Sequence, residues 1–104
     1  MTRRIVEITN SDESDSFIAN NKLGVIFFGS MRCPHCKTMV PFFQTLADKY
    51  PSVGFAHVEV SLVDVNDIDG VPVFAGYKDQ IPVASVLGAS KDALVSMIEK
   101  KLLS

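Results

Sequence analysis

Cysteine is scarce in this chain, which contains only two, Cys33 and Cys36, three positions apart. A structural disulfide stabilises a protein mainly by restricting the unfolded chain, and its effect is largest when it closes a long loop. A bridge between these two cysteines would close almost no loop, so stability is a poor reason for the pair. Redox chemistry, half of a metal site and chance remain as explanations, and the pattern favours redox chemistry.

Histidine is equally scarce, and this argues against a metal site. A closed zinc site takes four ligands from cysteine and histidine, and only His35 and His57 could complete one. His35 lies between the cysteines, where a third ligand would fit badly. The acidic run at 64–69 lacks the glycine and glutamate spacing of a calcium loop. We therefore expect neither a metal nor a cofactor.

Other absences exclude further classes of function. The net charge of -2 argues against nucleic acid, which needs a clustered basic surface. No apolar run reaches the ~20 residues of a membrane helix. Arg3 and Arg4 resemble the start of a signal peptide, but Glu7 interrupts the apolar region that should follow. We expect one cytoplasmic domain spanning residues 1–104, acting as a monomer away from membranes.

The hydrophobic pattern alternates between strands and helices. Five apolar segments predict strands, at 4–8, 24–29, 55–60, 73–77 and 83–87. Three helices should begin near Ser11, where Asn10 and Glu13 resemble a capping box, at Pro34 and after Ser90. The run 24–29 is apolar throughout, which is typical of a strand buried on both faces. This order predicts an α/β fold, with a mixed sheet covered by helices on both faces.

With this order, the chain resembles the thioredoxin family over nearly its whole length. The Cys-x-x-Cys lies between a buried strand and a helix, with Lys37 directly after it and Pro41 five residues beyond it. Val71-Pro72-Val73 stands where the family has its cis-proline, and Gly88 precedes the last helix as in thioredoxins. The resemblance implies a thioredoxin fold with about five strands. It also implies a thiol-disulfide oxidoreductase that uses a reversible Cys33-Cys36 dithiol.

The resemblance assigns roles to the residues of the motif. Cys33 would attack, because the helix that begins at Pro34 directs unpaired N–H groups and a positive dipole end toward it. His35 would further stabilise the thiolate, and Cys36 would resolve the mixed disulfide. The partners implied are protein disulfide or dithiol substrates and a thiol reductant such as thioredoxin reductase or glutathione.

The substrate site is also implied by the family. A cis bond before Pro72 would turn the backbone of Val71 toward the cysteines, where it could pair with an extended substrate segment. Arg32, in the place of the usual tryptophan, and Gly88 would complete this site.

Several positions depart from the thioredoxin pattern. Cys-Pro-His-Cys replaces Cys-Gly-Pro-Cys and resembles the DsbA-type oxidases, although the chain is too short for the helical domain that those oxidases insert. Phe27 stands in the place of a buried aspartate. By alignment, His57 replaces the lysine that accompanies this aspartate, which makes it a candidate proton relay; a histidine without a role is the alternative.

Two questions stay open at the level of sequence. The loss of the buried acid and of the active-site tryptophans also fits a thioredoxin-like binding or assembly module without turnover. The direction of exchange, as reductant or oxidant, depends on the partner that recharges the site.

Overall fold

The computed structural model describes residues 5–29, 34–59, 72–88 and 90–103. Within this part, five strands form one sheet in the order β1-β3-β2-β4-β5. The strands are β1 (Val6–Ile8), β2 (Leu23–Gly29), β3 (Gly54–Glu59), β4 (Val73–Lys78) and β5 (Ile81–Leu87). β1, β3 and β2 are parallel, whereas β4 and β5 each run antiparallel to their neighbours. The predicted mixed sheet is confirmed, and the acidic run at 64–69 lies outside the described residues.

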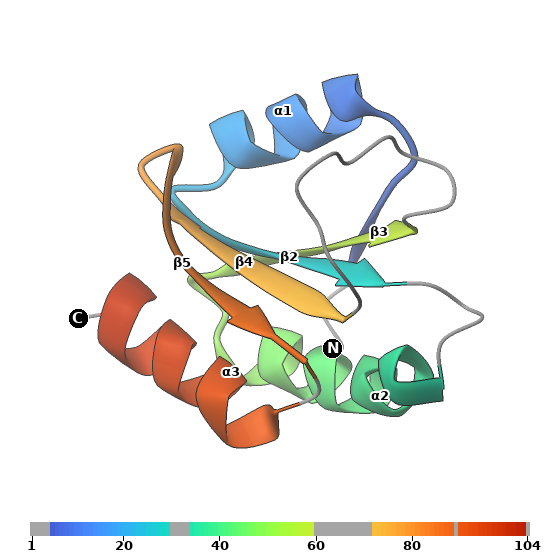
Figure 1. Cartoon of the computed structure of the whole chain (residues 1–104). Coiled ribbons are helices and arrows are strands. Elements are labelled where there is room, and N and C mark those ends of the chain that lie inside the picture. Colours follow the sequence, from blue (N-terminus) through green and yellow to red (C-terminus); the bar gives the residue numbers. More distant parts are fainter. Residues whose placement is uncertain (1–4, 30–33, 60–71, 89, 104) are drawn as a thin grey trace.

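Helices cover both faces of the sheet, as predicted (Figure 1). α1 (Ser11–Asn20) lies on one face. α2 (Pro34–Lys49) and α3 (Lys91–Met97), which continues into the π-helical turn η1 (Ile98–Leu102), lie on the other. None of the helices in the described ranges is both long and apolar enough to cross a membrane.

The start of α1 is fixed by the predicted capping pair. The side chain of Asn10 accepts a hydrogen bond from the backbone N–H of Glu13 at 2.9 Å. The carboxylate of Glu13 reaches back to Thr9, one residue earlier than in a standard capping box, and accepts from its N–H and its hydroxyl. These bonds hold the pKa of the Glu13 carboxyl below its usual value, because they stabilise the charged form.

The alternation of β2 divides the core into two layers. Val25 and Phe27 point toward α2 and α3, whereas Ile26 and Phe28 belong to the apolar cluster under α1. Every residue from 24 to 29 is buried, which confirms the prediction of a central strand.

The hairpin between β4 and β5 is tighter than the predicted strands at 73–77 and 83–87 require. Lys78 still pairs with Ile81, so the turn consists only of Asp79 and Gln80. Both have positive φ, 53° and 69°, as a two-residue turn that matches strand twist requires. β5 also begins two residues earlier than predicted and admits Pro82, because an edge strand tolerates a missing N–H.

Candidate active site

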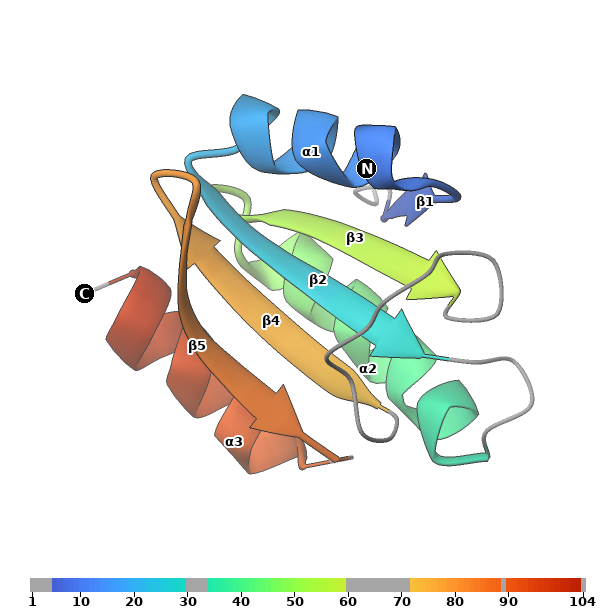
Figure 2. The same ribbon diagram turned by 45° about the horizontal axis from the view of Figure 1, so that its top comes forward.

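One end of the sheet brings together segments that are far apart in the sequence (Figure 2). In the register, Phe28 near the end of β2 pairs with Val73 at the start of β4. Val73 in turn pairs with Leu87 at the end of β5. α2 begins at the same end, a few residues after β2. The end of β2, the start of β4, the end of β5 and the start of α2 therefore lie close together.

The structure places half of the Cys-x-x-Cys motif at this end. Pro34 is exposed and is the first residue of α2, as its fixed φ favours. Cys36 lies in the first turn and is buried, with 3% of its surface exposed. The backbone of His35 belongs to the same turn. Cys33 and Arg32 lie outside the described residues.

Gly29 permits the close approach of Cys36 to the sheet. A Cβ atom at this position would lie 2.6 Å from Cε1 of Phe27 and 3.2 Å from Sγ of Cys36. Real Cβ atoms do not approach a ring carbon this closely, so any side chain here would displace the ring or the thiol. The glycine therefore allows Phe27 and Cys36 to pack side by side at the end of β2.

Two of the predicted substrate-binding residues are bonded to each other. The N–H of Gly88 donates to the carbonyl of Pro72 at 2.8 Å. Gly88 has a φ of +97°, a conformation that side-chain-bearing residues rarely adopt. Pro72 is buried directly before β4, beside the end of β2. Val71 lies outside the described residues, so the cis bond before Pro72 stays a prediction.

Phe27 is the centre of an aromatic cluster. It is fully buried, and its ring centroid lies 4.7 Å from that of Phe74, 5.4 Å from Phe43 and 5.2 Å from the imidazole of His57. The ring therefore contacts His57 and also borders the space beside Cys36. It occupies the region in which the family resemblance places an acid.

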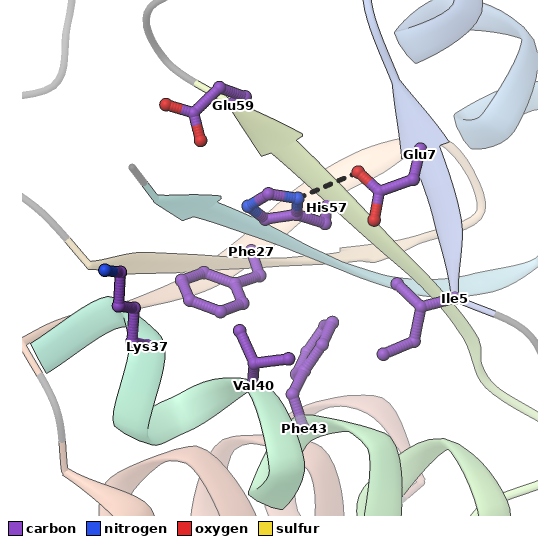
Figure 3. A pocket seen from close by; sticks show the side chains of 8 residues that line it. All are labelled: Ile5, Glu7, Phe27, Lys37, Val40, Phe43, His57 and Glu59. Carbon is purple, nitrogen blue, oxygen red and sulfur yellow. Dashed lines mark hydrogen bonds and ion pairs between the residues drawn. The ribbon is translucent and has the colours of Figure 1, made fainter. Parts of the chain in front are cut away.

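His57 makes a hydrogen bond to Glu7 that sequence reasoning missed. Its Nδ1 lies 2.9 Å from Oε2 of Glu7 (Figure 3). A carboxylate only accepts hydrogen bonds, so this contact assigns the proton to Nδ1 and leaves Nε2 as an acceptor in the neutral ring. Glu7 and His57 are partners in the register of β1 and β3. That pairing follows from strand order, which the sequence pattern alone does not give.

A pocket of about 610 Å³ opens beside these residues (Figure 3). Its lining combines apolar side chains with a charged rim; the described residues that line it are Ile5, Glu7, Phe27, Lys37, Val40, Phe43, His57 and Glu59. Strands β1, β2 and β3 and helix α2 all contribute to it. Among the described residues, no group of three or more His, Cys, Asp or Glu side chains could hold a metal ion.

Comparison with known proteins decides the family. The sequence profile of the thioredoxin family matches residues 5–100. The chain belongs to the thioredoxin family. Thioredoxin 1 of Plasmodium falciparum is 33% identical over 97 residues, which cover 89% of this chain and 93% of that protein. Thioredoxin-1 of Saccharomyces cerevisiae is 31% identical over 98 residues, which cover 90% of this chain and 95% of the relative.

Solved thioredoxin structures agree with the observed fold. A Plasmodium falciparum thioredoxin superimposes with a TM-score of 0.87 at 32% identity, and the match covers 93% of this chain and 99% of the Plasmodium chain. Mitochondrial thioredoxin 3 of Saccharomyces cerevisiae superimposes with a TM-score of 0.87 at 30% identity, and the match covers 91% of this chain and 93% of the yeast chain. The thioredoxin fold and the activity of a thiol-disulfide oxidoreductase are thereby established for this chain.

Proposed function

We propose that Cys33 attacks the substrate disulfide and that Cys36 resolves the intermediate. The burial of Cys36 in the first turn of α2 carries this assignment, because a shielded thiol is a poor first nucleophile. Cys33 directly precedes the helix, where the dipole and the unpaired N–H groups would favour its thiolate. The pair acts on protein disulfides as an enzyme.

Each step is a thiol-disulfide exchange. The thiolate of Cys33 bonds to one substrate sulfur, the substrate S–S bond breaks and the first substrate thiolate leaves. Cys36 then loses its proton and attacks the sulfur of Cys33, which releases the second substrate thiolate. Two electrons pass to the substrate, and the Cys33-Cys36 disulfide remains to be reduced by a partner. In the reverse direction the same steps oxidise a substrate dithiol.

The substrate segment, in this proposal, lies along the Pro72-Gly88 side of the site. The bond from Gly88 to Pro72 holds these two segments together at the sheet end that Cys36 faces. Val71 would supply backbone hydrogen bonds to the extended substrate, and Arg32 would border it. The absence of a Cβ at Gly88 leaves room for the substrate backbone.

His57 is the proposed proton relay for Cys36, with Glu7 as its positioning residue. The contact at 2.9 Å directs the Nδ1 proton to Glu7 and leaves Nε2 to accept a proton. The ring of Phe27 contacts His57, so we infer that the proton is transferred through water and not by direct contact with the thiol. His57→Gln should shift the pH profile of the resolving step. Glu7→Gln should shift it less, because the amide oxygen of the new side chain can still accept from Nδ1.

The Pro34-His35 pair should make this protein more oxidising than a typical thioredoxin. Stabilising the Cys33 thiolate favours the reduced form and raises the reduction potential. We expect a value between about -270 mV, typical of thioredoxin, and about -120 mV, typical of DsbA. Equilibration with glutathione measures it, and replacing Pro34-His35 by Gly-Pro should lower it. An unchanged reduction potential would mean that the helix terminus alone stabilises the Cys33 thiolate.

The proposed setting is the cytoplasm, with thioredoxin reductase or glutathione as the recycling reductant. The two cysteines serve the exchange reaction and form no long-range structural disulfide of the kind common in secreted domains. A coupled assay with each reductant in turn identifies the recycling partner. Immunolocalisation of the native protein tests the compartment.

Mixed-disulfide trapping tests the assignment of the two thiols. Cys36→Ser should accumulate covalent adducts with a disulfide-bonded substrate protein, because only the resolving step is removed. Cys33→Ser should trap none, and the double variant is the matched control. Trapping through Cys36 would reverse the roles. Survival of the biological function in Cys33→Ser would favour the binding-module alternative.

A further inference from the structure

The outer edge of β5 is long, apolar and uncharged. β5 is the last strand in the sheet order, so among the described strands it has a neighbour, β4, on one side only (Figure 2). Its seven residues, Ile-Pro-Val-Ala-Ser-Val-Leu, include no charged side chain. Three of its apolar residues are exposed, Ile81 by 62%, Val83 by 41% and Leu87 by 70%. An exposed apolar edge of this kind is a template for pairing with another strand.

The opposite edge of the sheet is protected, and this contrast singles out β5. β1 has only three residues, and the middle one, Glu7, is charged. Short edge strands and charged side chains are common means by which proteins prevent their edges from pairing. β5 has two other protective features, Pro82 and an irregular register opposite Gly76 and Tyr77, and both lie in its first half. Its second half, residues 84–87, has neither.

The backbone of this second half offers hydrogen-bonding groups to the open edge. The N–H of Gly88 donates to the carbonyl of Pro72, next to the first pair of the β4–β5 ladder. Backbone groups of an antiparallel strand face the same neighbour at every second residue, so those of Val86 also face β4. The N–H and C=O groups of Ser85 and Leu87 therefore point outward, where an added strand would bond to them.

The side chains of β5 make this edge complementary to itself. Ala84 and Val86 pack against the core on the side of α2 and α3, so Ser85 and Leu87 lie on the other face of the strand. Two copies of β5 that pair antiparallel about a two-fold axis at Ser85 bring each Leu87 opposite Val83 of the other copy. Such cross-strand apolar pairs stabilise an antiparallel sheet, and no like charges meet in this register.

We propose that two copies of this chain associate through β5, antiparallel and with Ser85 on the two-fold axis, and so form one continuous sheet. The edge suits a second copy because apolar residues meet apolar residues and no charge is buried. One strand from each copy makes a small interface, and interfaces below about 1,200 Å² belong mostly to transient complexes, so we expect a dissociation constant on the order of 100 µM. The monomer expected from the sequence is then the form at low concentration.

Analytical ultracentrifugation of the reduced protein tests the association. The average mass should rise from that of a monomer toward that of a dimer between about 10 µM and about 1 mM, a range that brackets the expected dissociation constant. Reducing conditions exclude dimers linked through Cys33. A chain that stays monomeric at the highest concentration would overturn the proposal and leave the edge to a segment of another protein. Growth beyond a dimer would also overturn it, because a two-fold contact closes on itself.

Two lysine substitutions on opposite edges of the sheet locate the interface. Val83→Lys places a charge opposite Leu87 of the other copy and should weaken the dimer at least about tenfold. Val6→Lys is the matched control, because Val6 is a valine of the other edge strand with a similar exposure of 46%, and it should leave the association unchanged. Both positions are exposed, so both variants should fold. Association of Val83→Lys like that of the parent, or its loss in Val6→Lys, would overturn the proposal.

Disulfide crosslinking tests the register and separates this inference from the proposed catalytic roles. The double variant Cys33→Ser/Cys36→Ser should associate like the parent, because the pairing uses neither cysteine; loss of association would overturn the proposal. In this background, Ser85→Cys should link two copies when oxidised glutathione is added. Residues that face each other across antiparallel strands have Cα atoms about 5.5 Å apart, a distance that a disulfide spans. Val6→Cys is the control, and equal crosslinking of both variants would contradict the proposed register.

Discussion

Replacing Phe27 by leucine should lower the free energy of unfolding by about 2–4 kcal/mol. The ring is fully buried and contacts the rings of Phe43, Phe74 and His57 at centroid distances of 4.7–5.4 Å. Each such pair contributes about 0.5–1.5 kcal/mol beyond the burial of its surface. Leucine would keep most of the apolar surface but would lose all three ring contacts. The domain should remain folded, because typical stabilities are about 5–15 kcal/mol.

Phe27→Asp restores the acid of the family pattern and should show a pH dependence that the leucine variant lacks. Burial among Phe43 and Phe74 should raise the pKa of the new carboxyl above its unfolded value of about 3.9. The folded state then binds the proton more tightly than the unfolded state. Stability should therefore fall as the pH rises from about 4 through the raised value, by up to about 1.4 kcal/mol per pH unit.

Urea unfolding of the parent, Phe27→Leu and Phe27→Asp at pH 5 and pH 7.5 measures both effects. The leucine variant is the control for lost ring contacts, so its difference from the aspartate variant isolates the carboxyl. Two results would refute the reasoning. One is a cost below about 0.5 kcal/mol for leucine, which would mean that the ring contacts do not stabilise the fold. The other is an equal pH dependence of the two variants, which would mean that position 27 is hydrated.

Three further changes test other parts of the structure. The hydrogen bond that Tyr50 donates to Glu99 raises the pKa of the phenol. The contribution of this bond to the free energy of unfolding should therefore be complete below about pH 10 and should be lost as the pH rises through the pKa of the phenol in the folded state. Tyr50→Phe should lower the free energy of unfolding by about 1 kcal/mol at pH 7 and should lose less stability than the parent at alkaline pH. An equal loss of stability at alkaline pH in both proteins would contradict the role given to this hydrogen bond. Gly88→Ala should cost about 1–3 kcal/mol through its positive φ and weaken trapping of substrate by Cys36→Ser; full stability would show that the turn relaxes. Asn10→Ala should cost about 1 kcal/mol in thermal or urea unfolding through loss of the helix cap, and Asn10→Ser should recover most of it.

Much of the fold could be predicted because its signals are local. The run at 24–29 is apolar throughout, and this indicates a central strand without any knowledge of its neighbours. Asn10 and Ser90 mark helix starts because their side chains bond to the N–H groups of the following turn. The sequence pattern predicts the start of β5 two residues too late, because Pro82 weakens the strand signal. The edge position of β5 tolerates this proline, which has no N–H to donate.

The site could be predicted only where a motif names its residues. The pattern Cys-Pro-His-Cys predicts Cys36 and Pro34 as site residues, and the structure brings Cys36 beside Gly29, at the sheet end at which Pro72 and Gly88 meet. The contact of Glu7 with His57 joins residues 50 positions apart. It depends on β1 pairing with β3, and periodicity does not reveal which strands are neighbours. The pocket was missed for the same reason, because three strands and one helix build it.

The substitution of Phe27 changes where a proton acceptor for Cys36 could lie. Gly29 allows the Phe27 ring to pack beside the thiol, and this ring excludes a carboxylate from the same space. The ring also contacts the imidazole of His57, and Glu7 holds the proton of that imidazole on Nδ1, so Nε2 is the acceptor of the neutral ring. A base in this arrangement does not touch the thiol and works through water. The proposed relay therefore predicts that His57→Phe should resolve the mixed disulfide more slowly than the parent, and an equal rate would contradict the relay.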